Sequence, residues 1–176
     1  MKTLYLLRHA KSSWDDPTLD DFDRPLAARG RAAAPRIGAF MRAAGWLPDM
    51  VLCSAARRTR ETWALVAAAL DADIAVTYTD ALFHGSPSGL LAVLRGAPDT
   101  AAAVALVAHS PAIENLAARL SGPGSDTAGL DLLRGKFPTA ALAVIAFDAD
   151  RWDAVGEGGG RLIRFVRPKD LAAPQS

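Results

Sequence analysis

Cysteine is nearly absent from this chain: Cys53 is the only one among 176 residues. A single cysteine excludes an internal disulfide, and a lone thiol is typical of a reducing compartment. An excess of one charge is also missing, because 20 Lys and Arg face 19 Asp and Glu. The net charge of +1 provides no overall attraction to nucleic acid or to acidic membranes. Any anion-binding site must therefore come from local clustering of arginine.

Long apolar runs are absent as well. Before Arg8 the chain has one lysine and then only four apolar residues, Leu4 to Leu7. This apolar run is too short for the apolar part of a secretory signal. No run approaches the ~20 residues that a membrane span needs. We therefore expect a cytoplasmic protein without membrane or nucleic-acid partners, and a monomer, the default for one small domain.

Short apolar runs alternate with longer helical stretches along the chain. Strands are predicted over residues 3–8, 49–54, 74–78, 102–109, 140–147 and 161–166, and helices over 26–45, 55–71, 87–95 and 111–120. The Gly- and Ser-rich stretch 121–137 is expected to be a loop that includes about one helical turn. The alternation predicts an α/β fold, a three-layer sandwich with a mostly parallel sheet flanked by helices. The last two strands are expected to form an antiparallel hairpin at one edge.

One domain is expected over residues 1–168, followed by a C-terminal tail over 169–176. In folds of this class, ligands bind at the carboxyl ends of the parallel strands. Polar residues that can donate hydrogen bonds to an anion follow three of the predicted strands or lie in the loop after the first strand. They are Arg8 and His9, Arg24, Ser54 with Arg58 behind it, and His109. Because the arginine fork matches pairs of phosphate oxygens, their convergence predicts a site for a dianionic tetrahedral group.

The same residues carry a resemblance to a known family. The stretches "LLRHA", "CSAARRTRET" and "VAHSPAIENLA" resemble the histidine phosphatase superfamily, whose signature is Arg-His-Gly after the first strand, a Ser-x-x-x-Arg-x-x-x-Thr segment and a second histidine. Ser54, Arg58 and Thr62 have that spacing. The stretches "RHAKSSW", "DFDRPLAARG" and "KFPTAALAVIAF" resemble the short subgroup of SixA-like phosphohistidine phosphatases. The resemblance covers residues 3 to about 166 and implies a phosphoglycerate mutase-like fold.

The resemblance also implies a role for each matching residue. His9 is the nucleophile that becomes phosphorylated, Arg8, Arg58 and His109 bind the phosphoryl oxygens, and Arg24 lines the same pocket. Two positions depart from the family pattern. Ala10 replaces the glycine of Arg-His-Gly, and the usual "GHNPG" is Ala108 to Ala112 here, in which Ser110 is expected to cap the following helix and to lie among the substrate-binding residues.

The residue types suit phosphoryl transfer without a metal or another cofactor. A neutral imidazole can attack phosphorus, provided that an acceptor such as a backbone carbonyl holds the other ring N–H. Three arginines and a protonated His109 would neutralise the charge that spreads over the phosphoryl oxygens. Together with the resemblance, this predicts a phosphatase that works through a phosphohistidine intermediate. The expected partner is a phosphorylated substrate, either a phosphohistidine protein or a small phosphate compound.

The leaving group distinguishes these substrates. An alkoxide leaves poorly without a general acid, and larger members of the superfamily place a glutamate or aspartate after the third strand. Here that segment is "YTDALFHGSPSG". Asp80 is either the acid or a turn residue, and His84 is an acid, a substrate contact or a surface histidine, the last two being favoured. A weak or missing acid favours a phosphoramidate such as phosphohistidine, because protonated imidazole leaves readily.

The sequence excludes two other nucleophiles. A cysteine-dependent phosphatase needs Cys-x-x-x-x-x-Arg, and that register from Cys53 ends at Thr59. A serine hydrolase based on Ser110 would need an N–H from Pro111, which has none, and a later histidine, which the chain lacks. A non-catalytic phosphate sensor and a small-molecule phosphomonoesterase of the same fold stay open. The aspartate-rich stretch 14–24 is expected to be a surface loop that places Arg24. Trp14 either packs beneath this loop or touches substrate, and packing is favoured.

Overall fold

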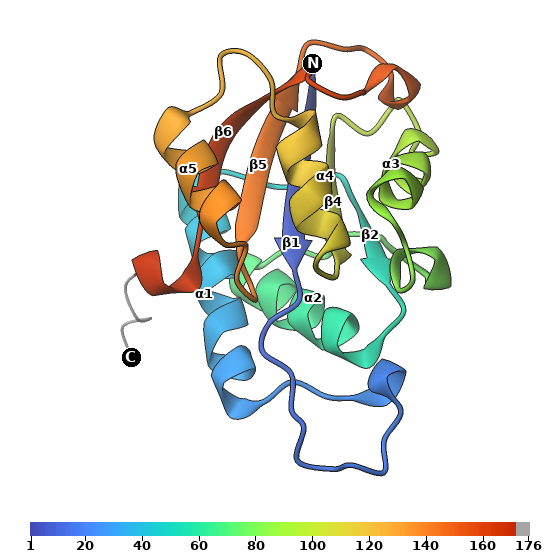
Figure 1. Cartoon of the computed structure of the whole chain (residues 1–176), viewed down its shortest axis with the longest axis vertical. Helices are drawn as coiled ribbons and strands as arrows, with labels where there is room; N and C mark the ends of the chain where they lie inside the picture. Colours follow the sequence, from blue (N-terminus) through green and yellow to red (C-terminus); the bar gives the residue numbers. More distant parts are fainter. Residues whose placement is uncertain (172–176) are drawn as a thin grey trace.

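The structure, a computed structural model, describes residues 1–171. Its centre is a six-stranded sheet with the order β3-β2-β4-β1-β5-β6 (Figure 1). The strands are β1 (Lys2–Arg8), β2 (Met50–Ser54), β3 (Val76–Thr79), β4 (Ala103–Ala108), β5 (Leu142–Phe147) and β6 (Gly160–Val166). The helices are α1 (Ala28–Ala44), α2 (Arg57–Leu70), α3 (Pro87–Arg95), α4 (Ala112–Leu120) and α5 (Thr127–Gly135). Four 3₁₀ turns complete the described chain: η1 (Asp21–Asp23), η2 (Asp80–Leu82), η3 (Trp152–Ala154) and η4 (Pro168–Asp170).

The predicted α/β sandwich and its sheet are confirmed. Strands β1 to β4 pair in parallel, β5 runs antiparallel to β1, and β6 runs antiparallel to β5. The two last strands therefore form the expected hairpin at one edge. The carboxyl ends of β1, β2, β3 and β4 consequently share one end of the sheet, and the segment between β1 and α1 extends beyond that end (Figure 1).

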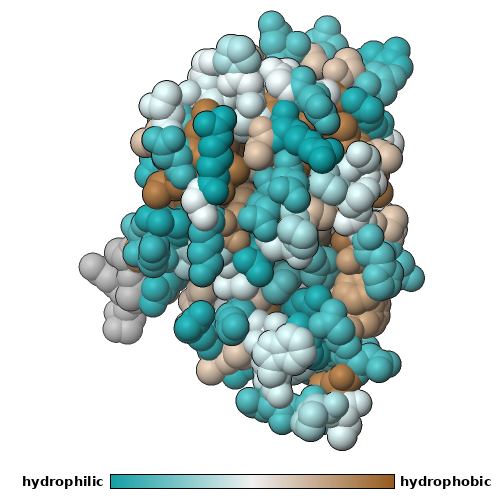
Figure 2. Space-filling model, viewed as in Figure 1, coloured by the Kyte–Doolittle hydropathy of each residue, from teal (hydrophilic) through white to brown (hydrophobic). Residues whose placement is uncertain are grey.

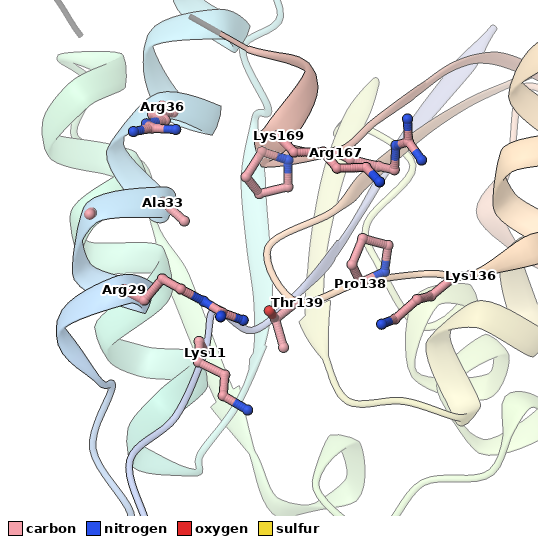
Figure 3. A pocket seen from close by; sticks show the side chains of 11 residues that line it. Lys11, Arg29, Ala33, Arg36, Lys136, Pro138, Thr139, Arg167 and Lys169 are labelled. Atoms are coloured by element: carbon pink, nitrogen blue, oxygen red, sulfur yellow. The ribbon is translucent and has the colours of Figure 1, made fainter. Parts of the chain in front are cut away.

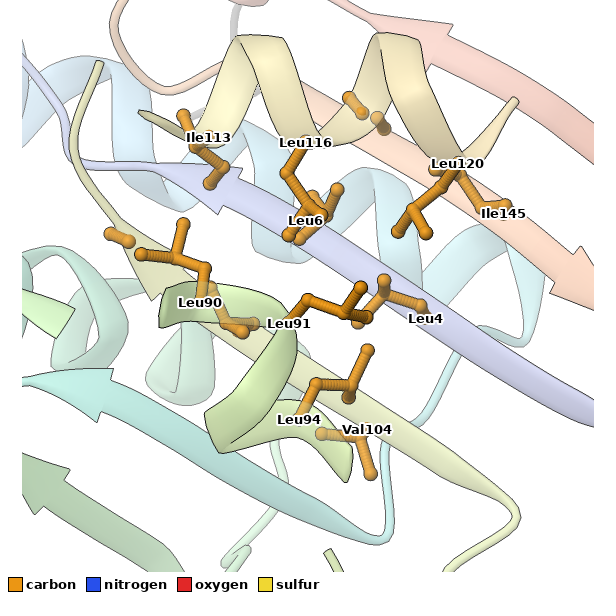
Figure 4. Packing of buried hydrophobic residues seen from close by; sticks show 14 of the residues in the cluster. Leu4, Leu6, Leu90, Leu91, Leu94, Val104, Ile113, Leu116, Leu120 and Ile145 are labelled. Atoms are coloured by element: carbon orange, nitrogen blue, oxygen red, sulfur yellow. The ribbon is translucent and has the colours of Figure 1, made fainter. Parts of the chain in front are cut away.

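The core has two halves because side chains alternate across the sheet with a period of two. Leu4 and Leu6 of β1 pack beneath α3 and α4, as Figure 4 shows. Tyr5 and Leu7 point to the opposite face, which α1 and α2 cover with residues such as Met41 and Trp63. This two-sided burial explains why the strands are almost continuously apolar and why polar residues occur only where they end.

Two local expectations are wrong. The stretch 121–137 contains α5, a nine-residue helix, because Asp126 accepts a hydrogen bond from the Gly129 N–H at 2.9 Å and caps its start. Ser110 does not cap α4: Pro111 takes the cap position and makes no side-chain capping bond. Ser110 lies one position too early for its hydroxyl to serve the first turn of that helix.

The expected tail, 169–176, lies largely outside the described residues, which end at Leu171. Residues Pro168–Asp170 form η4, which contacts α1, and Leu171 packs on the core half formed with α1 and α2. Within residues 1–171, no helix combines the length and the apolar character needed to cross a membrane. The face in Figure 2 accordingly shows hydrophobic residues as separate patches among hydrophilic ones.

Candidate active site

The pairing register of β1 and β4 brings two histidines together. Arg8 is paired with Ala108, so His9 and His109 each follow a paired residue in neighbouring parallel strands. The N–H of His9 continues the ladder and donates to the Ala108 carbonyl at 3.1 Å. The centroids of the two imidazole rings are 5.2 Å apart. Residues one hundred positions apart in sequence thus face one small volume at the end of the sheet.

The Ser-x-x-x-Arg-x-x-x-Thr segment supports this volume from β2 and α2. Ser54 Oγ lies 2.8 Å from Nε2 of His109. Arg58 and Thr62 lie one helical turn apart on α2, so both side chains lie on the same face. Thr62 Oγ1 accepts the N–H of Ala10 at 2.9 Å and donates to the Arg58 carbonyl at 2.6 Å. The segment therefore contacts both histidine-bearing strand ends.

Two buried arginines share one carboxylate at this site. Arg58 donates through Nη2 to Asp21 Oδ2 at 3.1 Å and through Nη1 to the Asp21 carbonyl at 2.6 Å. Arg24 donates through Nε to Asp21 Oδ1 at 2.9 Å, and its Nη1 donates to Ser12 Oγ at 2.8 Å. Burial opposes ionisation of Asp21, yet its bonds and charge interactions with Arg24 and Arg58 hold its pKa below the ordinary value. The carboxylate therefore occupies donors that are suited to an anionic ligand.

Arg8 reaches the site from the end of β1. Its Nη1 donates to the Phe137 carbonyl at 2.7 Å, while its Nε is buried without a partner among residues 1–171. Arg58 Nε is unpartnered in the same way. Buried guanidinium N–H groups are almost always hydrogen-bonded in proteins. Two unsatisfied donors beside the histidine pair are therefore available to an anion.

His9 is held as a neutral imidazole with a defined tautomer. Its Nδ1 lies 2.8 Å from the Ala10 carbonyl, which can only accept, so Nδ1 carries the proton and Nε2 is the free base. The pKa of His9 is lowered to about 4, mainly by burial and also by Arg58, Arg8 and Arg24, while the hydrogen bond to Ala10 opposes the shift. The expected backbone acceptor is thus the carbonyl of the next residue.

The pKa of His109 is lowered as well. This pKa is lowered to about 3, mainly by burial and also by His9, Arg58 and Arg8, while Asp21 opposes the shift. Two guanidinium groups and the ring of His9 act on this buried ring, so adding a proton to His109 costs electrostatic energy unless an anion enters. The protonated His109 expected above belongs to the step in which phosphoryl charge is present, and that expectation stays a prediction. Nδ1 of His109 is buried without a partner in the described chain. It is a further ring nitrogen available to a ligand.

Comparisons with known proteins agree with this geometry. Residues 4–83, which contain Arg8, His9, Arg24 and Arg58, match the histidine phosphatase superfamily (branch 1). An uncharacterized protein of Mycobacterium tuberculosis is 34% identical over 164 residues, which cover 93% of this chain and 100% of that relative. The chain belongs to the histidine phosphatase superfamily.

Solved structures place it in the SixA-like subgroup of that superfamily. The proposed phosphohistidine phosphatase SixA of Nakamurella multipartitia is 31% identical, with a TM-score of 0.81 over 95% of this chain and 96% of that one. A protein histidine phosphatase SixA complexed with tungstate, at 22% identity, shares the fold with a TM-score of 0.77 over 97% and 99% of the two chains. The protein is therefore a phosphatase, as expected from its sequence motifs.

The departures from the superfamily signature introduce no backbone strain. Asp71 and Ala140 are the non-glycine residues with positive φ in the described chain, so neither Ala10 nor Ala112 needs a glycine.

Ala140, with φ of 61°, holds the site from the other side, because its N–H donates to the His9 carbonyl at 3.0 Å. A residue in the left-handed region beside a functional loop is a common site of local strain.

The three remaining candidate residues, His84, Ser110 and Asp80, lie in different surroundings. His84 and Ser110 line a shared surface hollow with His109, and Phe83 links them: its ring centroid is 4.3 Å from that of His84 and 5.4 Å from that of His109. Asp80 begins η2 directly after β3 and makes no hydrogen bond with its carboxylate within residues 1–171. Ser110 Oγ is buried there without a partner.

Sequence reasoning missed Asp21 and Phe83. Asp21 is one of several aspartates in the stretch 14–24, and its composition does not distinguish it from its neighbours. Trp14, expected to pack beneath this loop, is 70% exposed and lies with its ring centroid 3.5 Å from the Arg24 guanidinium carbon. Within residues 1–171, no three His, Cys, Asp or Glu side chains are grouped as metal ligands.

Cys53 has an environment that agrees with its exclusion as a nucleophile. It lies in β2, and its side chain is completely buried. Burial raises the pKa of its thiol to about 12, although Thr59 and Arg60 oppose the shift. The thiolate is the reactive form of cysteine, so this side chain is inert at neutral pH.

Proposed function

We propose that the protein removes the phosphoryl group from phosphohistidine in a polypeptide, with His9 as the nucleophile. The observation that carries the proposal is the tautomer of His9. Because Nδ1 donates to the Ala10 carbonyl and the pKa is about 4, Nε2 has a free electron pair at neutral pH. A nucleophile of this kind is active without a separate base.

The first step forms the bond between Nε2 of His9 and phosphorus as the bond to the leaving nitrogen breaks. Arg8, Arg24 and Arg58 stabilise the charge on the phosphoryl oxygens, and the unpartnered Nε atoms of Arg8 and Arg58 supply hydrogen bonds. To admit these oxygens, the Asp21 carboxylate must share or release its arginines. In the second step, water attacks phosphorus, inorganic phosphate leaves, and the electron pair returns to Nε2.

His109 stabilises the same charge in this proposal. Its Nε2 is held by Ser54 Oγ, which in turn accepts the Ala56 N–H at 3.3 Å. The serine hydroxyl proton is therefore free to point to Nε2, which leaves the proton of the neutral ring on Nδ1 as a hydrogen-bond donor. A bound dianion would also raise the pKa of His109, because an opposite charge nearby favours the protonated ring.

The leaving group decides the substrate class. The Asp21 carboxylate is engaged by Arg24 and Arg58, and no hydrogen bond within residues 1–171 positions the Asp80 carboxylate as an acid for the leaving group. A departing imidazole takes up its proton readily, whereas an alkoxide depends on a positioned acid, which contributes roughly 10²–10⁴-fold. The site therefore suits a phosphoramidate better than an alkyl phosphate. The position of Asp80, directly after β3, is the observation that favours the alternative of a small-molecule phosphomonoesterase.

A substrate panel tests the proposal. We expect kcat/KM for a phosphohistidine peptide to exceed that for an alkyl phosphate by more than about 100-fold, the range that a missing acid allows. Asp80→Asn should reduce both rates by less than about threefold, while His9→Asn abolishes both. A preference for the alkyl phosphate, with a loss of about 100-fold in Asp80→Asn, would instead identify a phosphomonoesterase with Asp80 as its acid. Binding without turnover of either substrate would identify a sensor.

A further inference from the structure

A second cationic region lies next to the His9 pocket, in a cavity of about 410 Å³ between α1, the segment before β5 and the end of β6 (Figure 3). Six basic side chains line it, and we refer to it as the basic cleft. They are Lys11, Arg29, Arg36, Lys136, Arg167 and Lys169. The mechanism proposed above uses none of them.

The basic cleft and the His9 pocket share backbone. Lys11 follows His9 by two positions, and Thr139, in the cleft wall, precedes Ala140, whose N–H donates to the His9 carbonyl at 3.0 Å. Arg8 donates to the carbonyl of Phe137, which stands between the cleft residues Lys136 and Pro138. The backbone that frames the His9 pocket therefore also forms part of the wall of the basic cleft.

The charge of the basic cleft is largely uncompensated. Arg167 pairs with Asp170 at 2.8 Å, but the other five cations have no ion pair within 4.0 Å in residues 1–171. No acidic residue lines the cavity. Because the whole chain carries a net charge of only +1, this is a local concentration of positive charge. Clefts lined by one sign of charge attract ligands of the opposite sign.

The shape and residue types point to an extended anion. The cations come from four separate segments, and half of them are lysines, which act as mobile point charges where arginine would form a fork. Lys11, Lys136 and Lys169 are exposed at the rim. The walls between them are apolar, from Ala32, Ala33, Pro138 and Pro168. Carboxylates spaced along a polypeptide fit this arrangement better than one compact phosphate cluster.

We propose that the basic cleft binds an acidic segment of the polypeptide substrate while its phosphohistidine occupies the His9 pocket. This rests on the proposed function, because it adds a docking site to the same reaction. The cleft then selects among phosphohistidine proteins by the acidity of the sequence or surface beside the modified residue. Such selection acts on KM and on the association rate, and it weakens as salt screens the charges.

The hydrolysis test compares two peptides in each protein. One peptide has glutamates on both sides of a central phosphohistidine, and the other has glutamines. For the wild type at low salt we expect kcat/KM to be about tenfold higher for the glutamate peptide, since each exposed pair contributes a few tenths to 1 kcal/mol. In the variant Lys136→Gln/Lys169→Gln the ratio should fall to about two or less. The control Arg42→Gln/Arg161→Gln removes the same charge outside the cleft and should keep the ratio.

A binding test separates this proposal from the proposed function. Fluorescence anisotropy measures the Kd of the glutamate peptide without phosphate, of a single-stranded oligonucleotide of equal charge, and of phosphatidylserine vesicles. Peptide binding that weakens about fivefold only in the cleft variant supports the proposal, even if no phosphohistidine is hydrolysed. Equal peptide binding by both variants, or tighter binding of the oligonucleotide or the vesicles, overturns it.

Discussion

The hydroxyl of Thr62 on α2 accepts the backbone N–H of Ala10 at 2.9 Å, across 52 positions of sequence. This bond holds the residue whose carbonyl in turn fixes the tautomer of His9. Thr62 also donates to the Arg58 carbonyl. One threonine thus aligns the backbone beside the proposed nucleophile with the helix that carries a phosphoryl-binding arginine.

Thr62→Val should reduce stability and activity together. Valine keeps the shape but leaves the buried N–H of Ala10 unsatisfied, which costs about 1–3 kcal/mol. We also expect kcat to fall by about tenfold or more, because the Ala10 carbonyl no longer holds His9 in place. Urea unfolding and steady-state kinetics measure the two effects. Thr62→Ser, which retains the hydroxyl, should recover most of both, and a valine variant with unchanged kcat would contradict this role.

Asp21→Asn should strengthen the binding of tungstate or vanadate. The substitution removes a negative charge that competes for Arg24 and Arg58, and one unit charge in a partly exposed site contributes about 1 kcal/mol. The inhibition constant of tungstate should therefore fall by about fivefold.

Asp23→Asn is the matched control, because Asp23 belongs to the same short helix and makes no ion pair within residues 1–171. Its inhibition constant should stay within twofold of the wild type. Weaker tungstate binding in Asp21→Asn would show that the carboxylate orients the arginines and does not compete with the anion.

The positions of Arg8, His9 and His109 could be predicted because each follows a buried strand directly. A strand end can be recognised in the sequence where charged residues follow an apolar run. Parallel strands then bring these ends together at one edge of the sheet. Asp21 could not be predicted in this way. Several aspartates share its loop, and only the folded path of that loop determines which carboxylate reaches Arg58.

Three other features could not be predicted from the spacing of apolar residues in the sequence. The helix α5 was hidden by glycines, although Asp126 provides its cap. The lowered pKa of His109 follows from how deeply the ring is buried near other nitrogen groups, which residue type alone does not reveal. The basic cleft is assembled from four segments whose individual charges look like an ordinary solvated surface.

Two glycines of α1 should have different effects when changed to alanine. A Cβ on Gly30 would overlap the backbone carbonyl of Lys11, just after His9, whereas one on Gly38 would overlap the Val66 carbonyl of α2. Both variants should lose about 1–3 kcal/mol of stability through overpacking. Only Gly30→Ala should also lower kcat/KM, by about tenfold, because it displaces the loop after His9.

Gly135→Ala serves as the control for these glycines. Nothing lies within 4 Å of a Cβ at that position, near the end of α5. Its melting temperature and kcat/KM should match or slightly exceed those of the wild type. Equal kinetic losses in Gly30→Ala and Gly38→Ala would contradict a specific link between Gly30 and the site.

Acidification should destabilise the protein well above the pH at which most carboxylates are protonated. His9 and His109 have pKa values lowered to about 4 and about 3, whereas an unfolded histidine titrates near 6.5. The unfolded chain therefore binds more protons below about pH 6.5, and stability falls as pH decreases towards 4. Each ring contributes a slope of up to about 1.4 kcal/mol per pH unit.

Urea midpoints between pH 7.5 and 4.5 measure this dependence. The midpoint should be nearly constant above pH 7 and should decrease steadily below pH 6. His9→Gln should show a smaller decrease, since one of the two titrating rings is gone. A wild-type midpoint that stays constant from pH 7 to pH 5 would show that the pKa values of the two histidines are not lowered in the folded protein.

The central claim is that His9 accepts the phosphoryl group, and rapid acid-free quenching with a ³²P-labelled phosphohistidine peptide tests it most directly. The account predicts a transient label on the wild-type protein that is lost in acid and stable in base, as a phosphorus–nitrogen bond requires. His109→Asn should retain some label because it keeps the nucleophile, and His9→Asn should carry none. Label of the same amount on His9→Asn, or no label on wild type that hydrolyses the peptide, would contradict the account.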